Sequence, residues 1–147
     1  MDREIEFHFR TPEDSLGYLL WQTSMQWQKN MNRALKELKL THTQFVILAA
    51  LGWLLKEGEE VTQKEIAAHS NTDRMMVSKI LRNLQKNELI ERREHSTDTR
   101  AKCVSLTVAG KKKLQRALKI VQDTDNAFFA SIEEEQTVKK ELQKLIQ

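Results

Sequence analysis

The sequence contains few of the residues that break regular structure or cross-link a chain. Its 147 residues include four glycines, one proline and one cysteine. So little glycine and proline predicts few turns and a mainly helical chain. The single cysteine, Cys103, excludes an intramolecular disulfide and any site that requires several cysteines.

Long apolar runs and a strong net charge are also missing. The apolar stretches 45–51 and 53–55 are far shorter than the roughly 20 residues that span a bilayer. The N-terminus has acidic residues and no apolar core, so we expect no signal peptide, no membrane partner and a cytoplasmic location. The net charge of +3 does not by itself indicate a nucleic-acid partner.

The positive charge is nevertheless concentrated in one segment. Residues 74–102 carry eight basic and four acidic side chains, a balance of +4, whereas the other 16 basic and 17 acidic residues sum to −1. A local cationic surface suits contact with phosphates. An ordinary solvated face gives the same count, so charge alone leaves both interpretations open.

Helix starts are marked clearly along the chain. Thr11, Thr41 and Thr62 begin capping patterns, and apolar residues recur after them at helical spacing. Further helix starts are expected near Thr72–Asp73, after Thr107, and at Ser131 with Glu134. We therefore predict helices over about 12–38, 42–56, 63–69, 73–87, 108–130 and 131–145.

Two short segments have the pattern of strands instead. Residues 89–93 and 102–106 are predicted to pair as a hairpin whose polar tip spans 94–101. Near the N-terminus Ile5, Phe7 and Phe9 alternate with polar residues. This alternation indicates either a short strand or an arm packed on a partner.

This order of elements predicts a mainly α fold, a winged helix-turn-helix, in a single domain over 1–147. Residues 41–107 form the winged lobe, in which a short helix, a turn and a second helix are followed by the hairpin. The flanking segments 1–38 and 108–147 have apolar faces that they cannot cover alone. We expect these segments to be dimerisation helices that pair with a second copy of the chain.

The second helix of such a unit enters the major groove of double-stranded DNA and reads bases from its N-terminal half. Arg74 can bind guanine in a bidentate manner, Arg100 at the hairpin tip can reach the minor groove, and Asp98 is expected to fix that turn. An amphipathic surface helix and a solvated hairpin tip are the alternatives. The predicted DNA contacts are Thr62, Gln63, Asn71, Thr72, Asp73, Arg74, Met75, Ser78, Lys79, Arg82, Arg93 and Arg100.

Several motifs resemble the MarR family of bacterial and archaeal regulators. They are Q-K-E-I-A at 63–67, V-S-K-I-L-x-x-L at 77–84, L-I-E-R at 89–92, D-x-R at 98–100 and V-x-L-T-x-x-G at 104–110. The resemblance implies a triangular homodimer that binds a pseudo-palindromic operator and usually represses transcription until a ligand or an oxidant acts. A winged-helix module that binds protein without DNA is the alternative function.

The sequence departs from the family at two points. Glu88 stands where the family usually has glycine, and we expect Asn87 to adopt the turn conformation in its place. The first helix has no reactive cysteine, and Cys103 is expected to be a buried, inert thiol.

Small-molecule and catalytic chemistry are only weakly indicated. The resemblance implies an effector pocket, which Tyr18, Trp21, Met25 and Trp53 can line, although core packing is the more ordinary role for each. The four histidines are scattered along the sequence. We expect no metal, no cofactor and, without a catalytic motif, no enzyme activity.

Overall fold

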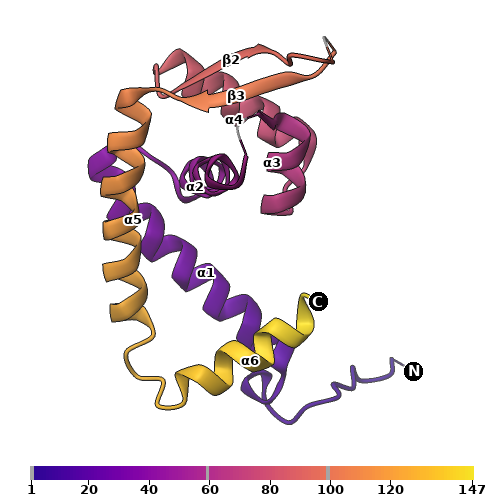
Figure 1. Cartoon of the computed structure of the whole chain (residues 1–147). Helices are drawn as coiled ribbons and strands as arrows, with labels where there is room; N and C mark the ends of the chain where they lie inside the picture. Colours follow the sequence, from indigo (N-terminus) through magenta and orange to yellow (C-terminus); the bar gives the residue numbers. More distant parts are fainter. Residues whose placement is uncertain (1, 59, 99) are drawn as a thin grey trace.

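The computed structural model describes residues 2–58, 60–98 and 100–147 (Figure 1). It confirms the prediction of a mainly helical, winged helix-turn-helix fold. The elements in chain order are the 3₁₀ turn η1 (Pro12–Asp14), α1 (Leu16–Leu35), η2 (Lys36–Leu38), α2 (His42–Glu57), β1 (Val61–Thr62), α3 (Gln63–Ser70), α4 (Arg74–Lys86), β2 (Ile90–Glu94), β3 (Lys102–Leu106), α5 (Val108–Phe128) and α6 (Glu135–Leu145).

Helix α2 is the centre of the winged lobe because it is apolar on most of its surface. Helices α3 and α4 lie on one side of it, the sheet covers it, and α5 runs down the other side (Figure 1). Its residues Ile47, Leu48 and Leu51 are fully buried. The buried face of α4 and the N-terminal half of α5 complete the core, which also includes Leu35, Ile66, Val77, Leu81, Leu84, Leu114 and Ala117.

The wing is a three-stranded antiparallel sheet in the order β1-β3-β2. The predicted hairpin pairs Ile90 with Leu106 and Glu94 with Lys102. Strand β1 was not predicted: its two residues pair with β3, with Val61 opposite Val104. This pairing ties the start of α3 directly to the base of the wing.

Most of the predicted helix starts are confirmed. Thr41, Thr62 and Thr107 each accept a hydrogen bond from a backbone N–H three residues later, at 2.9–3.2 Å. The first helix differs, because Thr11 begins only the turn η1 and Ser15 caps α1 through the Tyr18 N–H. These caps satisfy backbone donors that have no partner within the helix.

The turn between α4 and β2 corrects one prediction. Glu88, not Asn87, adopts the left-handed conformation, with φ 61°, whereas Asn87 has φ −84°. The N–H of Glu88 bonds to Gln85 O and that of Leu89 to Leu84 O, both at 3.0 Å. These two bonds form a Schellman motif, in which the residue after the cap is the left-handed one.

The V-x-L-T-x-x-G motif connects this turn to α5. The Thr107 hydroxyl donates to the Glu88 carbonyl at 2.7 Å and accepts from the Gly110 N–H at 2.9 Å. A Cβ atom at Gly110 would lie 1.9 Å from the Leu89 carbonyl oxygen. Glycine is therefore required at this position because the first turn of α5 presses against the chain entering β2.

The terminal segments differ from prediction in two details. Helix α6 begins at Glu135, without a side-chain cap, so the expected start at Ser131 is wrong. Residues 2–10 form no strand, and Ile5 and Phe7 are 82% and 68% exposed. The strand interpretation of this segment is thus wrong, and an arm packed on a partner stays a prediction.

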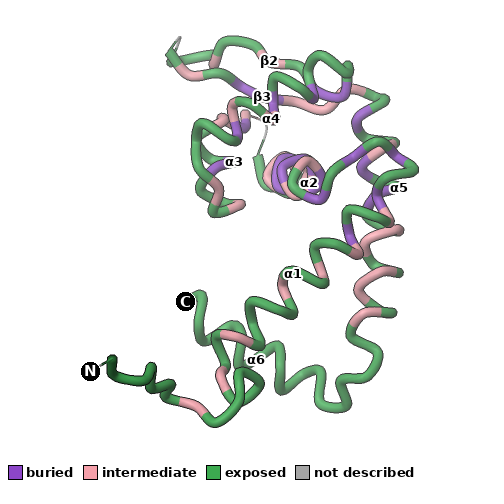
Figure 2. Tube along the Cα trace, turned by 180° about the vertical axis from the view of Figure 1, so that it is seen from behind, coloured by how far each residue is buried: buried purple, intermediate pink, exposed green. Residues whose placement is uncertain are grey.

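The described core lies almost entirely in the winged lobe. Figure 2 shows buried residues around α2 and the upper part of α5, whereas α6 and the N-terminal segment are exposed. Helix α6 buries none of its residues. Among residues 2–58, 60–98 and 100–147, no single helix is long and apolar enough to span a membrane. The helical segments Leu16–Leu38 and His42–Glu57 reach the length and apolar composition of a span only when taken together, and they meet at a bend of 77°.

Candidate nucleic-acid interface

The fold brings the start of α3, the start of α4 and the wing tip together around one hollow, which we call the wing groove. Its volume is about 490 Å³. Four cationic side chains and one carboxylate line it, together with smaller polar groups. The lining residues are Thr62, Gln63, Lys64, Arg74, Asp98, Arg100, Ala101 and Lys102.

Five of these eight residues were predicted to contact DNA or to shape the wing. Thr62 is the N-cap of α3 and Gln63 is its first residue. Because backbone N–H groups are free at a helix N-terminus, this end of α3 attracts anions. Lys64 and Lys102 were not assigned to the site, since only the folded sheet shows that they face the same hollow as Arg74 and Arg100.

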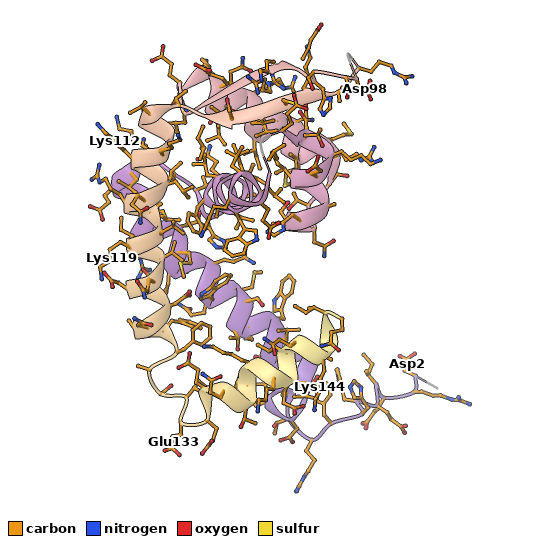
Figure 3. The ribbon with its side chains drawn as sticks, in the orientation of Figure 1. Asp2, Asp98, Lys112, Lys119, Glu133 and Lys144 are labelled. Atoms are coloured by element: carbon orange, nitrogen blue, oxygen red, sulfur yellow. The ribbon has the colours of Figure 1, made fainter. Side chains whose placement is uncertain are left out.

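Asp98 has the predicted structural role in the wing turn. Its carboxylate accepts the backbone N–H of Arg100 at 3.1 Å and lies 3.7 Å from the Arg100 Nε. Figure 3 shows Asp98 at the tip of the wing. The Arg100 side chain is 95% exposed, so its charge is available to a ligand without any rearrangement of the core.

Helix α4 presents a second polar surface beside the wing groove. Val77, Leu81 and Leu84 face the core, which leaves the opposite side of the helix to solvent. Arg74, Met75, Lys79 and Arg82 are exposed there and Ser78 is half-buried, as a helix that enters the major groove requires. Met76, which was not predicted, is also exposed.

Three residues around the turn of the helix-turn-helix shape the backbone. Asn71 ends α3 with φ 49°, and the Thr72 hydroxyl donates to Ser70 O at 3.1 Å. Asp73 is the N-cap of α4, where its Oδ1 accepts the N–H groups of Met75 and Met76 at 2.9 and 3.1 Å. All three were predicted to contact DNA, and Thr72–Asp73 was also predicted to begin this helix.

The remaining predicted residues lie apart from the wing groove. Arg93 lies on β2, opposite Cys103 of β3.

Cys103 is buried as predicted, and burial raises the pKa of its thiol, which disfavours the reactive thiolate.

The four candidate pocket residues lie on two helices. Tyr18, Trp21 and Met25 are on α1, and Trp53 is on α2. Trp21 and Trp53 are 63% and 52% exposed, and Met25 borders a hollow of about 500 Å³ that Phe128 of α5 also lines. The effector pocket stays a prediction.

Known proteins share this architecture. The winged-helix domain family described as ArnR1-like matches residues 36–125. The HTH-type transcriptional regulator YdcH of Bacillus subtilis is 42% identical over 144 residues, which cover 97% of this chain and 98% of YdcH.

Solved structures agree with the sequence relatives. The MepR–DNA complex of S. aureus has a TM-score of 0.81 and 28% identity, covering 90% of this chain and 96% of MepR. A mutant of E. coli MarR complexed with operator DNA has a TM-score of 0.80 at 22% identity, covering 90% and 94%, and supports the fold alone. The chain therefore belongs to the winged-helix, HTH-type transcriptional regulators of the MarR family.

Proposed function

We propose that this regulator binds double-stranded DNA as a homodimer and represses transcription by occupying a pseudo-palindromic operator. Helix α4 enters the major groove, and Arg100 at the wing tip enters the adjacent minor groove. A protein with this role acts where the chromosome lies, in the cytoplasm. The similarity to MepR, which was solved in complex with DNA, supports this proposal.

The wing groove is the observation that carries the proposal. It places the N-terminus of α3 beside Arg74 at the start of α4 and Arg100 at the wing tip. A phosphate at this point meets both free backbone N–H groups and cationic side chains. Such a phosphate contact fixes the position of the protein along the duplex and thereby holds the exposed face of α4 against the bases.

The exposed apolar side of helix α6 supports the dimer. The side chains of Val138, Leu142 and Leu145 recur along one side of α6 and are 38–74% exposed. Exposed apolar faces of this kind mark surfaces that associate. A second copy of the chain supplies the matching face, and a small-molecule effector near Trp21 and Met25 would act by changing the spacing of the two winged lobes.

Arg100→Ala tests the role of the wing. The substitution should weaken binding to operator DNA by about ten- to a hundredfold and reduce the salt dependence of binding by about one phosphate contact. The melting temperature of the variant should equal that of the unmodified protein, because the Arg100 side chain is 95% exposed. Fluorescence anisotropy with a labelled duplex measures the binding.

Lys119→Ala is the matched control. Lys119 is an exposed cation on α5, away from the wing (Figure 3), and its ion pair with Asp123 at 3.0 Å lies on the surface. Such pairs contribute little to stability. Equal DNA affinities for the two variants would show that the wing arginine does not contact DNA.

A further inference from the structure

A cluster of three metal-ligating side chains lies where the wing strands meet the hairpin tip, and none of the three lines the wing groove. Glu60 precedes β1, His95 follows β2 and Cys103 lies within β3. One donor atom from each lies within 4.8 Å of the other two, and the His95 Nε2 is 3.0 Å from the Glu60 Oε2. We propose that Glu60, His95 and Cys103 bind a divalent cation of the zinc class.

The donor set matches that cation. Thiolate, imidazole and carboxylate are the three side-chain groups that bind zinc, at 2.0–2.3 Å. Tetrahedral coordination places its donors roughly 3.5 Å apart, so donor atoms that already lie within 4.8 Å of one another reach it through small side-chain movements. Glu60 and His95 are half-buried at the ends of strands, where such a movement is easily accommodated. A water molecule would fill the fourth position.

The charges also balance. The Glu60 carboxylate and a Cys103 thiolate neutralise a doubly charged cation, and the thiol releases one proton on binding. Arg93 pairs with Cys103 across the sheet and opposes a cation there, but its side chain is exposed and water screens its charge. Glu65 adds a further negative charge near Cys103.

Hydrogen bonds connect this cluster to the wing turn. The His95 Nδ1 accepts the backbone N–H groups of Thr97 and Asp98, both at 3.2 Å. The imidazole hydrogen is therefore on Nε2 and points at the Glu60 carboxylate. The same turn contains the Asp98 carboxylate that holds Arg100.

A cation at Nε2 would change this turn. The cation can bind Nε2 only when the imidazole proton leaves that nitrogen. The proton then moves through solvent to Nδ1, so that Nδ1 can no longer accept the two N–H groups. The turn at 97–98 must then rearrange, and we expect weaker DNA binding. This consequence rests on the proposed function, whereas cation binding itself does not.

The proposal revises the expectation that the chain binds no metal. That expectation rested on the scattered histidines and the single cysteine. The three ligands lie in different parts of the sequence, and only the pairing of β1 and β2 with β3 brings them together.

Cobalt(II) titration of the metal-free, full-length protein tests the proposal, because cobalt takes zinc-like geometries and reports on its ligands. We expect one cobalt ion per protomer, a thiolate-to-cobalt charge-transfer band in the near ultraviolet, and loss of the band on addition of zinc. Cys103→Ser should abolish the band. Glu60→Gln and His95→Gln should each weaken cobalt binding by about tenfold or more.

His69→Gln is the matched control, because His69 is an exposed histidine on α3 outside the cluster. It should bind cobalt as the unmodified protein does. Glu60→Gln changes a half-buried side chain and keeps the test valid if Cys103→Ser fails to fold. Absence of a thiolate band in the folded protein, or a band that Glu60→Gln and His95→Gln leave unchanged, would overturn the proposal.

Discussion

At the scale of single residues, Glu88 has an unfavourable backbone conformation. A side chain in the left-handed region costs roughly 1–2 kcal/mol because its Cβ approaches the following carbonyl. Glu88 adopts φ 61° because the Schellman motif and the bond from Thr107 to its carbonyl fix the turn. The hydrogen bonds of the Schellman motif and the bond from Thr107 offset this conformational cost in the folded protein.

Glu88→Gly should therefore stabilise the protein. We expect up to about 1 kcal/mol, since glycine adopts positive φ freely but also loses more conformational entropy on folding. Urea unfolding measures the change.

Asn87→Gly is the adjacent control. Asn87 has a negative φ of −84°, so glycine there adds flexibility to the unfolded chain and removes the exposed bond from Asn87 Nδ2 to Asn83 Oδ1, and it should lower stability by roughly 0.5–1 kcal/mol. Changes of the same sign for both variants would contradict the assignment of the left-handed position.

At the scale of elements, His42 connects three helices at the base of the winged lobe. Its ring lies 4.7 Å from that of Trp27 on α1, in an edge-to-face arrangement. Trp27 in turn donates from Nε1 to the Asp125 Oδ1 on α5 at 2.8 Å. Burial lowers the pKa of His42, and the nearby Asp125 carboxylate only partly opposes this effect.

The lowered pKa predicts how stability changes with pH. In the unfolded chain His42 titrates near its ordinary value of 6.5, whereas the folded protein keeps it neutral to lower pH. Between the two pKa values the unfolded state binds more protons, so stability falls as the pH drops below about 6.5 and levels off below the folded pKa. His42→Phe should remove this part of the decline in melting temperature.

His69→Gln is again the control, because His69 is an exposed histidine that takes no part in the contact between His42 and Trp27. Melting temperatures at neutral pH and about one unit below the ordinary histidine pKa provide the comparison. An unchanged decline in the His42→Phe variant would show that this ring is not the group responsible.

The elements were predicted best where their signals are local. Thr41 and Thr62 mark helix starts through hydrogen bonds to residues three positions away, which the sequence alone reveals. Strand β1 was missed because its two residues are extended only through pairing with β3. The start expected at Ser131 failed because the chain turns there before α6 begins.

The same distinction applies to the candidate site. Asp98 and Arg100 are visible in the D-x-R motif, and Arg74 is visible at the predicted start of the second helix. Lys64 and Lys102 join them only because the sheet places the wing over the start of α3.

At the scale of the whole molecule, the fold separates a well-packed lobe from a C-terminal helix, α6, that contributes nothing to the core. Helix α6 runs across the base of the molecule, far from the wing (Figure 1). It buries none of its own residues. This imbalance is explained if residues 1–38 and 108–147 act as the dimerisation part of one domain, as we propose.

Leu142→Glu tests this division. Leu142 is 49% exposed on the apolar side of α6. A charge there should weaken the dimer by at least about tenfold, because it would be buried without a partner. Analytical ultracentrifugation over a range of concentrations measures the shift toward monomer.

Lys140→Glu is the control for Leu142→Glu. It changes a charge on a different side of the same helix and should leave the dimer intact. A dimer that Leu142→Glu leaves unaffected would remove α6 from the proposed interface.

The central claim is that the folded dimer reads a DNA sequence through α4 and the wing. Fluorescence anisotropy with the duplex upstream of its own gene, compared with a scrambled duplex over a range of salt concentrations, tests it most directly. The account predicts a specific Kd on the order of 10⁻⁸ to 10⁻¹¹ M at physiological salt, about a thousandfold or more tighter than for the scrambled duplex, and weaker as salt rises. Equal affinity for the two duplexes, or affinity that does not change with salt, would contradict it.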